Sequence, residues 1–378
     1  MIVGAYEHPD RIIKDRSVAT VHAEVARGAL ADAGLTMDDV DGLFAVGGDI
    51  TLPGLALADY LGLTGLRYVD TSMTGGSSPV CMIGHAAAAI ADGRCRVALI
   101  TLAARARSSR PAPIGRETPD VPFEQVYGSS TLGMYALAAM RHMHEFGTTS
   151  EQLAEIKVAA SLHAQHNPRA LLRTPVTVEE VLASPLVSDP LRRMDCCVVS
   201  DGGGAVVMVA ADVARDLERR GVRLLGQSET VGHTDNGTIG LTATAARWTA
   251  PRAFAEAGVG PDDIDYASIY DSFTITVLET LEDLGFCDKG KGGAFVADGA
   301  LRAPFGRLPI NTDGGGLCNN HPSMGGMSRL VEAVRQLRGE AAPEVQVADC
   351  GLALVHGSGG RIGSRHVAAT AILAAEGA

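Results

Sequence analysis

Four hydroxyl side chains lie at a glycine corner in "RYVDTSMTGGSSPVCMIGHAAAAIADG", residues 67–93. They are Ser72, Thr74, Ser77 and Ser78. The pattern predicts the end of a strand, a tight turn and an Ala-rich helix, and enzymes often hold a nucleophile at such a corner. The nearest thiol, Cys81, falls inside the expected helix. A hydroxyl attacks only with a hydrogen-bonded base and an oxyanion hole, so the corner is either a nucleophile site or only a turn.

Three side chains suited to acid–base chemistry occur later in the chain: Tyr270, His321 and His356. Tyr270 ends the apolar stretch "YASIY", where it is either a site residue or a core tyrosine. His321 lies in the Gly-rich loop "GGGLCNNHPSMGG", and His356 opens the Gly-rich turn "HGSGG". A neutral imidazole is a suitable base near pH 7, and a tyrosine hydroxyl is a suitable proton donor.

Glycines accompany both histidines: Gly315, Gly316, Gly359 and Gly360. Such residues let the backbone approach a ligand and can direct N–H groups at an oxyanion. They can equally serve only as turn formers. The neighbouring Asp271 is expected to orient a backbone group or side chain rather than to react.

Composition narrows the class of protein. The chain has 378 residues, 46% of them hydrophobic, with 45 glycines and a net charge of −12, which suits an α/β protein and disfavours nucleic-acid binding. We expect no signal peptide and no membrane span. The seven cysteines form no CxxC pair, so we expect no metal site, no disulfide framework and a cytoplasmic location.

A short internal repeat organises the chain. Residues 29–41, "ALADAGLTMDDVD", match residues 253–265, "AFAEAGVGPDDID", at seven of thirteen positions. Each copy predicts a helix ending at a glycine, a polar turn and an apolar strand. We therefore expect two similar βαβ-rich halves, 1–220 and 221–378, with a mostly parallel sheet covered by helices. A region at about 105–200 is expected to be an insertion in the first half that lies over that half.

Four motifs resemble those of sterol-carrier-protein-type thiolases. "HNPRALLRTPVTVEEVLASPLVSDPLRRMDCCVVSDGGGAVVM" at 166–208 is similar to their loop-domain stretch. "IYDSF" at 269–273 is similar to their His-Asp-Cys-Phe motif, with Tyr270 in the His position. "NNHPSMGG" at 319–326 is similar to the Gly-His-Pro loop, and "LVHGSGGRIG" at 354–363 to their last Gly-rich loop. The resemblance implies the duplicated thiolase fold, a five-layer αβαβα sandwich that is usually dimeric.

The resemblance also implies chemistry on acyl-CoA thioesters. Thiolases carry the acyl group on a cysteine, and Ser72 takes that position here. Thiolase-like aldolases lack the cysteine and cleave β-hydroxyacyl-CoA by a retro-aldol step. They replace two histidines by tyrosine, and this chain matches at Tyr270 but keeps His321. The resemblance therefore favours an aldolase in which His321 is the base and Tyr270 the donor, with the two roles open to exchange.

Binding residues and partners complete these expectations. Arg105, Arg107 and Arg110 either pair with CoA phosphates or form a solvated loop. No cofactor is expected beyond the CoA of the substrate. The aldolase relatives act with a small OB-fold, zinc-ribbon protein, so such a partner is expected beside a homodimer. Two alternatives stay open: a thiolase-type acyltransferase using Ser72 or another thiol, and a non-catalytic acyl-CoA-binding subunit.

Overall fold

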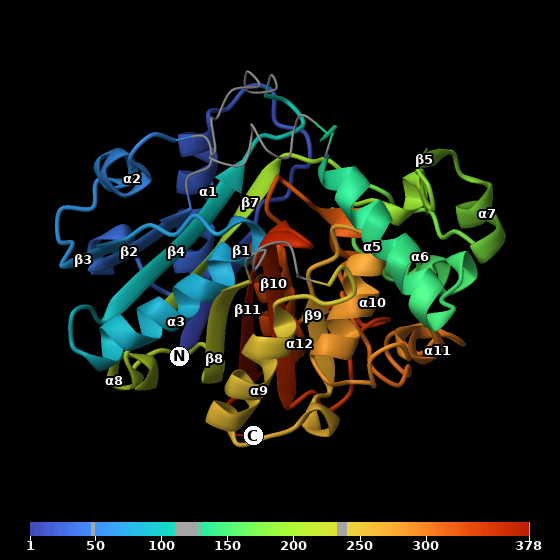
Figure 1. Cartoon of the computed structure of the whole chain (residues 1–378). Coiled ribbons are helices and arrows are strands. Elements are labelled where there is room, and N and C mark those ends of the chain that lie inside the picture. The colour runs from blue at the N-terminus through green and yellow to red at the C-terminus, as the bar shows by residue number, and fades with distance from the viewer. Residues whose placement is uncertain (47–49, 110–126, 129, 233–239, 378) are drawn as a thin grey trace.

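The computed structural model describes residues 1–46, 50–109, 127–128, 130–232 and 240–377, which form two β-sheets with helices between and outside them (Figure 1). The strands of the sheets are β1 (Ile2–Glu7), β2 (Gly42–Val46), β3 (Tyr68–Asp70), β4 (Val97–Ala104), β7 (Gly202–Val209), β8 (Arg223–Gly232), β9 (Tyr266–Ile269), β10 (Leu352–Arg361) and β11 (Ser364–Ala374), beside a small hairpin of β5 (Leu186–Ser188) and β6 (Leu191–Arg192). The α-helices are α1 (Val18–Ala33), α2 (Pro53–Leu61), α3 (Ser78–Ala91), α5 (Thr131–Phe146), α6 (Ser150–Ala164), α7 (Val178–Ala183), α8 (Ala211–Arg215), α9 (Ala246–Ala257), α10 (Thr274–Asp283), α11 (Gly292–Val296) and α12 (Gly326–Arg338). Short 3-10 turns lie at Met37–Asp39, Gly75–Ser77, Arg193–Asp195 and Pro261–Asp263, and a π-turn at Gly315–Asn319.

Both sheets are mixed rather than mostly parallel. The first has the strand order β1-β7-β4-β2-β3, and the second has the order β8-β11-β10-β9. Strand β2 runs parallel to β3 and β4, whereas β7 runs antiparallel to β1 and β4. In the second sheet only β9 and β10 are parallel. The expectation of a mostly parallel sheet is therefore wrong. The strands are apolar on both faces because helices cover both sides of each sheet, whatever the strand direction.

Five layers stack in the order expected of the thiolase fold. Helices α1 and α2 cover the outer face of the first sheet in one apolar cluster. Helices α3 and α12 lie between the two sheets and share a second cluster with the inner faces of both. Helices α9 and α10 cover the outer face of the second sheet. The predicted αβαβα sandwich is confirmed (Figure 1).

The sequence repeat corresponds to a repeat of structure. Helices α1 and α9 end at Gly34 and Gly258, and both glycines adopt φ of 72°, a left-handed conformation that favours glycine. A 3-10 turn follows each helix, and a buried strand, β2 or β9, follows each turn. The equivalence predicted for 29–41 and 253–265 is confirmed. The domain boundary near 220 stays a prediction, although β7 and β8 belong to different sheets.

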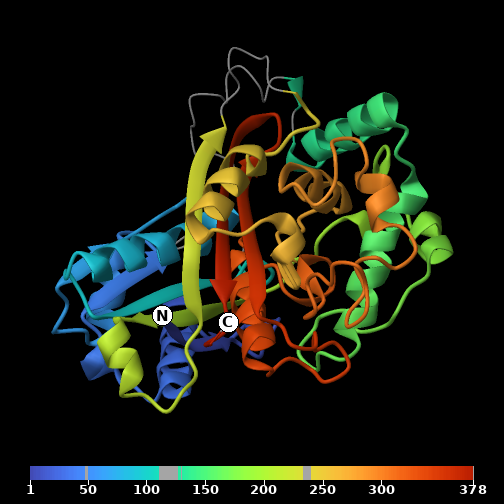
Figure 2. The same ribbon diagram turned by 90° about the horizontal axis from the view of Figure 1, so that it is seen from below.

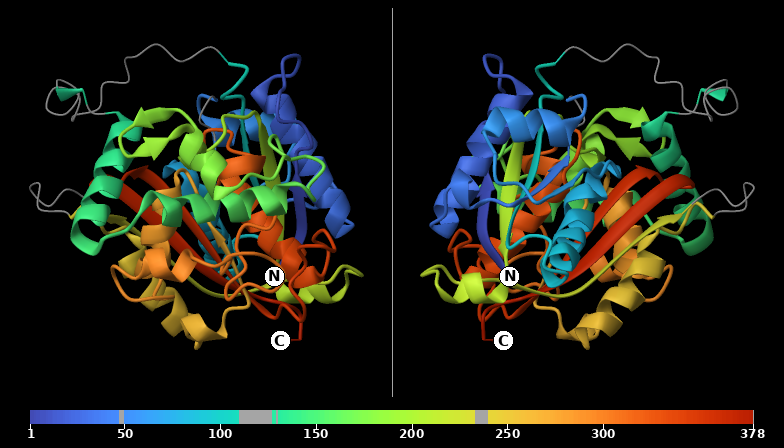
Figure 3. Two further views of the ribbon diagram at one scale, coloured as in Figure 1. Left: turned by 90° about the vertical axis from the view of Figure 1, so that its right-hand side faces the viewer. Right: turned by 90° about the vertical axis from the view of Figure 1, so that its left-hand side faces the viewer.

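The region expected to cover the first half packs largely elsewhere. Helices α5 and α6 contact α10, and α6 also contacts α11 and the π-turn at Gly315–Asn319. Figures 2 and 3 show these helices beside the elements of the second half. The expectation was wrong because the apolar faces of α5 and α6 complete the outer core of the second sheet. Among the described helices, none has the length and apolar content needed to cross a membrane.

Candidate active site

Tyr270 and His321 form a hydrogen-bonded pair at the meeting point of the two halves. Tyr270 follows β9, and His321 lies between the π-turn at Gly315–Asn319 and α12. The Tyr270 Oη and His321 Nε2 atoms are 2.8 Å apart. Their rings meet edge to face, with centroids 5.5 Å apart. The structure therefore joins the two side chains for which acid–base roles were predicted.

The backbone around each ring is fixed by neighbouring segments. The Tyr270 N–H donates to the carbonyl of His356 at 3.0 Å, which continues the pairing of β9 and β10 beyond the end of β9. The His321 N–H donates to Ser200 Oγ at 2.9 Å, and Ser200 Oγ donates to Asn320 Oδ1 at 2.7 Å. Ser200 belongs to the "SDG" stretch of the loop-domain motif. It is a supporting residue that residue-type reasoning missed, although it stands inside a recognised motif.

Burial sets the protonation of the pair. Burial, with a smaller contribution from the charge of Arg329, lowers the pKa of His321 to about 4. Burial also raises the pKa of Tyr270 above its usual value. Near neutral pH the imidazole is therefore neutral and the phenol keeps its proton. With the imidazole proton on Nδ1, the Tyr270 hydroxyl donates to Nε2, and its oxygen remains able to accept a proton from a substrate.

Glycines bring the corner of the first half against this pair. A Cβ at Gly76 would lie 2.1 Å from Tyr270 Cε2, and a Cβ at Gly326 would lie 1.9 Å from the Gly76 carbonyl oxygen. Gly326 is the first residue of α12, and Gly76 precedes α3 by two residues. The N-termini of two helices thus converge beside Tyr270. Their partial positive charges favour negative charge that develops in a reaction there.

The corner supplies no evident nucleophile. The Ser72 hydroxyl has no hydrogen-bond partner among the described residues, so none of these residues acts as its base. Ser72 does not cap α3 either, because the helix begins at Ser78 and its N-cap is Ser77. Ser72 is therefore a residue of the turn before α3 and not the cap of that helix. Burial raises the pKa of the Cys81 thiol to about 12, which leaves it protonated at neutral pH.

His356 lies on the other face of the second sheet. Its Nδ1 atom pairs with Thr370 Oγ1 at 2.9 Å, and burial lowers the pKa of the ring to about 3. Leu354 and Ile372, which share its side of the strands, belong to the outer cluster with α9. The structure therefore separates the His356 ring from Tyr270 and His321. His356 contributes its carbonyl to the site, not its imidazole.

The glycines with predicted oxyanion roles have structural tasks. The N–H groups of Gly315 and Gly316 donate to the carboxylates of Asp313 and Asp271, at 3.0 Å and 2.8 Å, so they are occupied in this structure. A Cβ at Gly359 would lie 1.9 Å from the Thr74 carbonyl oxygen. Gly360 adopts φ of 72°, and a Cβ there would lie 1.9 Å from the Arg365 carbonyl oxygen. These last two glycines allow β10 to approach the corner and β11.

The predicted CoA-binding arginines differ in their surroundings. Arg105 donates to the backbone carbonyls of Ile13 and Lys14, which gives it a structural contact. Arg107 borders a cavity of about 640 Å³. Arg110 lies outside the described residues.

That cavity, called the arginine cavity here, lies between α6, the 171–176 loop and the 193–199 segment. Its charged lining residues are all cations, namely Arg107, Lys157, Arg173 and Arg193. Leucine, valine, methionine and cysteine side chains form most of the remaining wall. Cys318, three residues before His321, also lines it, so the cavity borders the segment that carries His321. Such a lining suits a ligand with an apolar body and an anionic end.

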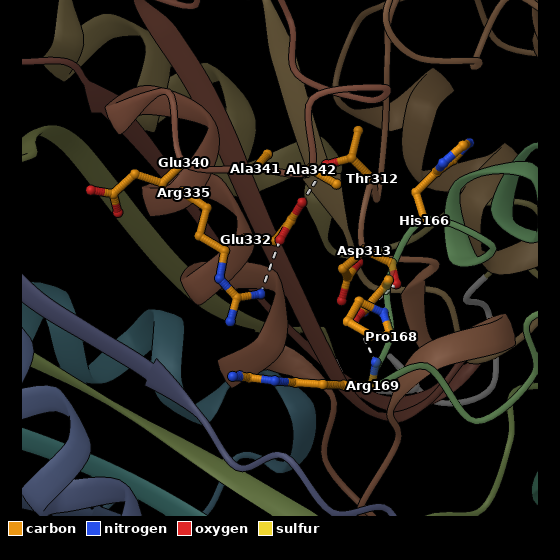
Figure 4. A pocket seen from close by; sticks show the side chains of 11 residues that line it. His166, Pro168, Arg169, Thr312, Asp313, Glu332, Arg335, Glu340, Ala341 and Ala342 are labelled. Atoms are coloured by element: carbon orange, nitrogen blue, oxygen red, sulfur yellow. Dashed lines mark hydrogen bonds and ion pairs between the residues drawn. The ribbon is translucent and has the colours of Figure 1, made fainter.

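A second cavity, of about 310 Å³, lies among residues 166–169, residues 312–313 and the side chains of α12 (Figure 4). Arg169, Arg335, Asp313 and Glu332 border it, and Glu332 bonds to Thr312 and Arg335. Charges of both signs are paired here, so the cavity has no net preference for an anion. In the described ranges no group of three His, Cys, Asp or Glu residues is arranged to hold a metal ion.

Comparisons with known proteins agree with this architecture. The family description "Thiolase C-terminal domain-like" matches residues 229–374. An acetyl-CoA acetyltransferase from Methanothermobacter thermautotrophicus is 33% identical over 97% of this chain and 97% of its own length. A 17-hydroxy-3-oxo-4-pregnene-20-carboxyl-CoA lyase from Mycobacterium tuberculosis is 34% identical over 87% of this chain and 89% of its own.

A solved structure extends the likeness to three dimensions. The structure named Ltp2-ChsH2(DUF35) aldolase has 32% sequence identity to this chain and a TM-score of 0.91. The match covers the whole of this chain and 97% of the other. Both sequence and fold therefore point the same way, and the chain belongs to the thiolase family, in its sterol-carrier-protein-type branch.

Proposed function

We propose that the protein cleaves the bond between Cα and Cβ of a β-hydroxyacyl-CoA by a retro-aldol reaction. The observation that carries the proposal is the 2.8 Å contact between Tyr270 Oη and His321 Nε2 beside two converging helix N-termini. The names of two relatives, a carboxyl-CoA lyase and an aldolase, support the same reaction class. A steroid or lipid side chain is the substrate type these names suggest.

In the proposed reaction the pair acts as a proton relay. The substrate β-hydroxyl gives its proton to Tyr270 Oη while the Tyr270 proton moves to His321 Nε2. The Cα–Cβ bond then breaks, its electron pair forms the thioester enolate, and the Cβ carbon leaves as a ketone or aldehyde. The helix N-termini stabilise the enolate oxygen. The relay returns its proton to Cα, which gives a shorter acyl-CoA and restores both residues.

For the acyltransferase alternative, neither Cys81 nor Ser72 is an activated nucleophile in the part of the chain that the structure describes. Transfer of an acyl group requires an ionised thiol or an activated hydroxyl. Burial keeps the Cys81 thiol protonated, and Ser72 has no base among the described residues. The name of the acetyltransferase relative supports the thiolase architecture but supplies no missing group to this chain.

We propose that the acyl-CoA substrate occupies the arginine cavity. Its apolar wall suits an acyl chain or the pantetheine arm, and its guanidinium groups suit phosphates. No cofactor beyond the substrate's own CoA enters the proposed reaction. The seven unpaired cysteines suit a reducing compartment, and we propose the cytoplasm.

Two kinds of protein partner belong to the proposal. Exposed apolar side chains gather on and near the edge strand β3, including Leu55, Val69 and Met73. We propose that a second copy of the chain covers them in a homodimer. The name Ltp2-ChsH2(DUF35) joins two components, which supports a small OB-fold, zinc-ribbon partner.

The experiment is a cleavage assay with β-hydroxyacyl-CoA thioesters of steroid and short-chain type. The chain is tested alone and after co-expression with a small zinc-ribbon protein, and products are identified by mass spectrometry. A shorter acyl-CoA together with a ketone or aldehyde is expected, and Tyr270→Phe should abolish both. Full cleavage by Tyr270→Phe contradicts the proposed relay. An acyl group attached to the protein during turnover would support the acyltransferase instead, and binding without product under either condition would support a non-catalytic subunit.

A further inference from the structure

Asp271 connects the two segments that carry the catalytic pair. It directly follows Tyr270, and its side chain is buried. One carboxylate oxygen accepts the Gly316 N–H at 2.8 Å, and the other accepts the Leu317 N–H at 3.1 Å. Both donors belong to the π-turn at Gly315–Asn319, which ends two residues before His321. One carboxylate thus ties the end of β9 to the segment that carries the imidazole.

Other contacts hold the remaining sides of the π-turn. Lys157 Nζ donates to the Leu317 carbonyl at 2.8 Å from the side of the arginine cavity. Asn319 donates to Asp313 at 2.8 Å, and Arg329 pairs with the same carboxylate at 2.7 Å. Asp271 is distinct among these residues because it adjoins Tyr270 in the chain. A change in its two hydrogen bonds therefore alters the turn relative to Tyr270 itself.

We propose that ionised Asp271 is a positioning residue that keeps His321 within hydrogen-bonding reach of Tyr270, and that loss of its two hydrogen bonds to the π-turn on protonation lowers activity. The inference rests on the proposed retro-aldol function for its kinetic consequence. The structural consequence of losing the Asp271 carboxylate is that the Tyr270 and His321 rings separate. This separation is independent of the reaction that the two residues catalyse.

The charges around Asp271 come from several elements. Arg329 of α12 approaches within 3.6 Å and favours the ionised form, as do the two N–H donors. Asp313 opposes it, and the thiols of Cys197 and Cys318 face it from the neighbouring segments. Burial has the largest effect and raises the pKa of Asp271 to about 6.

The sign of the effect follows from this raised pKa. As the pH falls through about 6, Asp271 gains a proton and can no longer accept both N–H groups as a carboxylate does. The pKa of His321 lies lower, at about 4, so protonation of the imidazole is a separate event in more acidic solution. An activity loss centred near the higher value therefore reports Asp271.

The test compares Asp271→Asn with the unchanged chain. The amide keeps the size of the side chain but directs an NH2 group at a backbone N–H. We expect kcat to fall by about tenfold or more with little change in KM, since the loss is one of geometry. The acid limb of the kcat profile should move from about 6 to about 4. Asp283→Asn is the matched control, because Asp283 is also buried and ion-paired but bonds to Lys289 and Thr244 instead.

A second readout needs no substrate. Diethyl pyrocarbonate acylates neutral imidazole nitrogens, and the bond from Tyr270 shields His321 Nε2 in the unchanged chain. Peptide mass spectrometry should show several-fold faster modification of His321 in Asp271→Asn, and no change in Asp283→Asn. If no β-hydroxyacyl-CoA is cleaved by any form, the proposed function fails, and this reaction still decides the role of Asp271.

A third measurement covers the case in which Asp271→Asn does not fold. The acid limb of the unchanged enzyme is then recorded at several temperatures. A carboxyl group has a small heat of ionisation and an imidazole a large one, so a limb that hardly moves supports Asp271. A limb with a large temperature dependence, or a folded Asp271→Asn with normal kcat and normal His321 protection, overturns the proposal.

Discussion

Gly76 and Tyr270 approach so closely that a Cβ on Gly76 would lie 2.1 Å from Tyr270 Cε2. We therefore expect Gly76→Ala to displace the Tyr270 ring, to lower kcat by about tenfold or more, and to destabilise the fold by about 2 kcal/mol. Steady-state kinetics and thermal unfolding measure the two effects. Gly65→Ala is the control, since nothing lies within 4 Å of a Cβ there. Equal activity of the two variants would show that the contact does not matter for the reaction.

Ser72 is expected to be dispensable. Its hydroxyl has no hydrogen-bond partner among the described residues, and therefore no basic side chain among them to remove its proton. Ser72→Ala should keep kcat within about twofold of the unchanged enzyme and leave the melting temperature nearly the same. Intact-mass spectra during turnover should show no acyl adduct in either protein. A large loss of activity, or an acyl adduct that disappears in Ser72→Ala, would show that Ser72 takes part in the reaction.

The arginine cavity predicts a selective effect on substrate binding. Arg173→Gln and Arg193→Gln each remove a cation from its wall. We expect either change to raise KM for a CoA thioester by about tenfold. A thioester of pantetheine, which lacks the phosphates, should be affected much less. Arg215→Gln in α8, outside the cavity, is the control. Equal effects on both thioesters would mean that the arginines recognise the acyl group rather than the phosphates.

The exposed edge of the first sheet predicts how two copies associate. Val69 lies on β3 and is 47% exposed, and a lysine on an edge strand opposes pairing with a second chain. Val69→Lys should weaken the proposed homodimer by about tenfold or more in sedimentation equilibrium. Val231→Lys on β8, the edge of the second sheet, should leave it intact. A dimer that tolerates the first change and not the second would place the interface on the other sheet.

His85 predicts a pH-dependent contribution to stability. It bonds to Glu229 on β8 and to Asp70 on β3, and these partners raise its pKa to about 9. Because the folded-state value lies above the unfolded one, the contribution is complete below about pH 6.5 and is lost as the pH rises through about 9.

The measurement is a set of thermal melts across this pH window. The three side chains are partly exposed, so solvent screening limits the contribution to about 1 kcal/mol. His85→Gln should lower the melting temperature at about pH 6, and the difference should vanish near about pH 10. A difference that stays constant across this range would assign the effect to packing.

The sequence predicted features that depend on local patterns. The αL glycines Gly34 and Gly258, with the turns and strands after them, follow from residues adjacent in the chain. The sequence identifies Tyr270 and His321 as candidates because each lies within a motif, "IYDSF" or "NNHPSMGG", that resembles a thiolase motif. Their hydrogen bond could not be derived from the residues alone, since it joins positions 51 apart.

The errors concern long-range packing. His356 pairs with Ile269, the residue before Tyr270, and successive residues point to opposite faces of a sheet, so the His356 and Tyr270 side chains lie on different faces. The sequence does not reveal that the N–H groups of Gly315 and Gly316 donate to carboxylates, because only folding brings Asp313 and Asp271 to them in this geometry. Likewise, the position of α5 and α6 depends on which sheet has an apolar face that no other helix covers. Local sequence patterns do not contain this information.

Two of the glycine contacts between the corner and the second half join main chain to main chain: the Thr74 carbonyl against Gly359, and the Gly76 carbonyl against Gly326. A frame built from main chain does not depend on which reactive side chain it carries. The consequence is that the reactive residues can change during evolution while the fold is kept. Point substitutions can exchange one reaction class for another while the architecture is inherited unchanged, and the same property makes position 72 a natural place to install a new nucleophile by design.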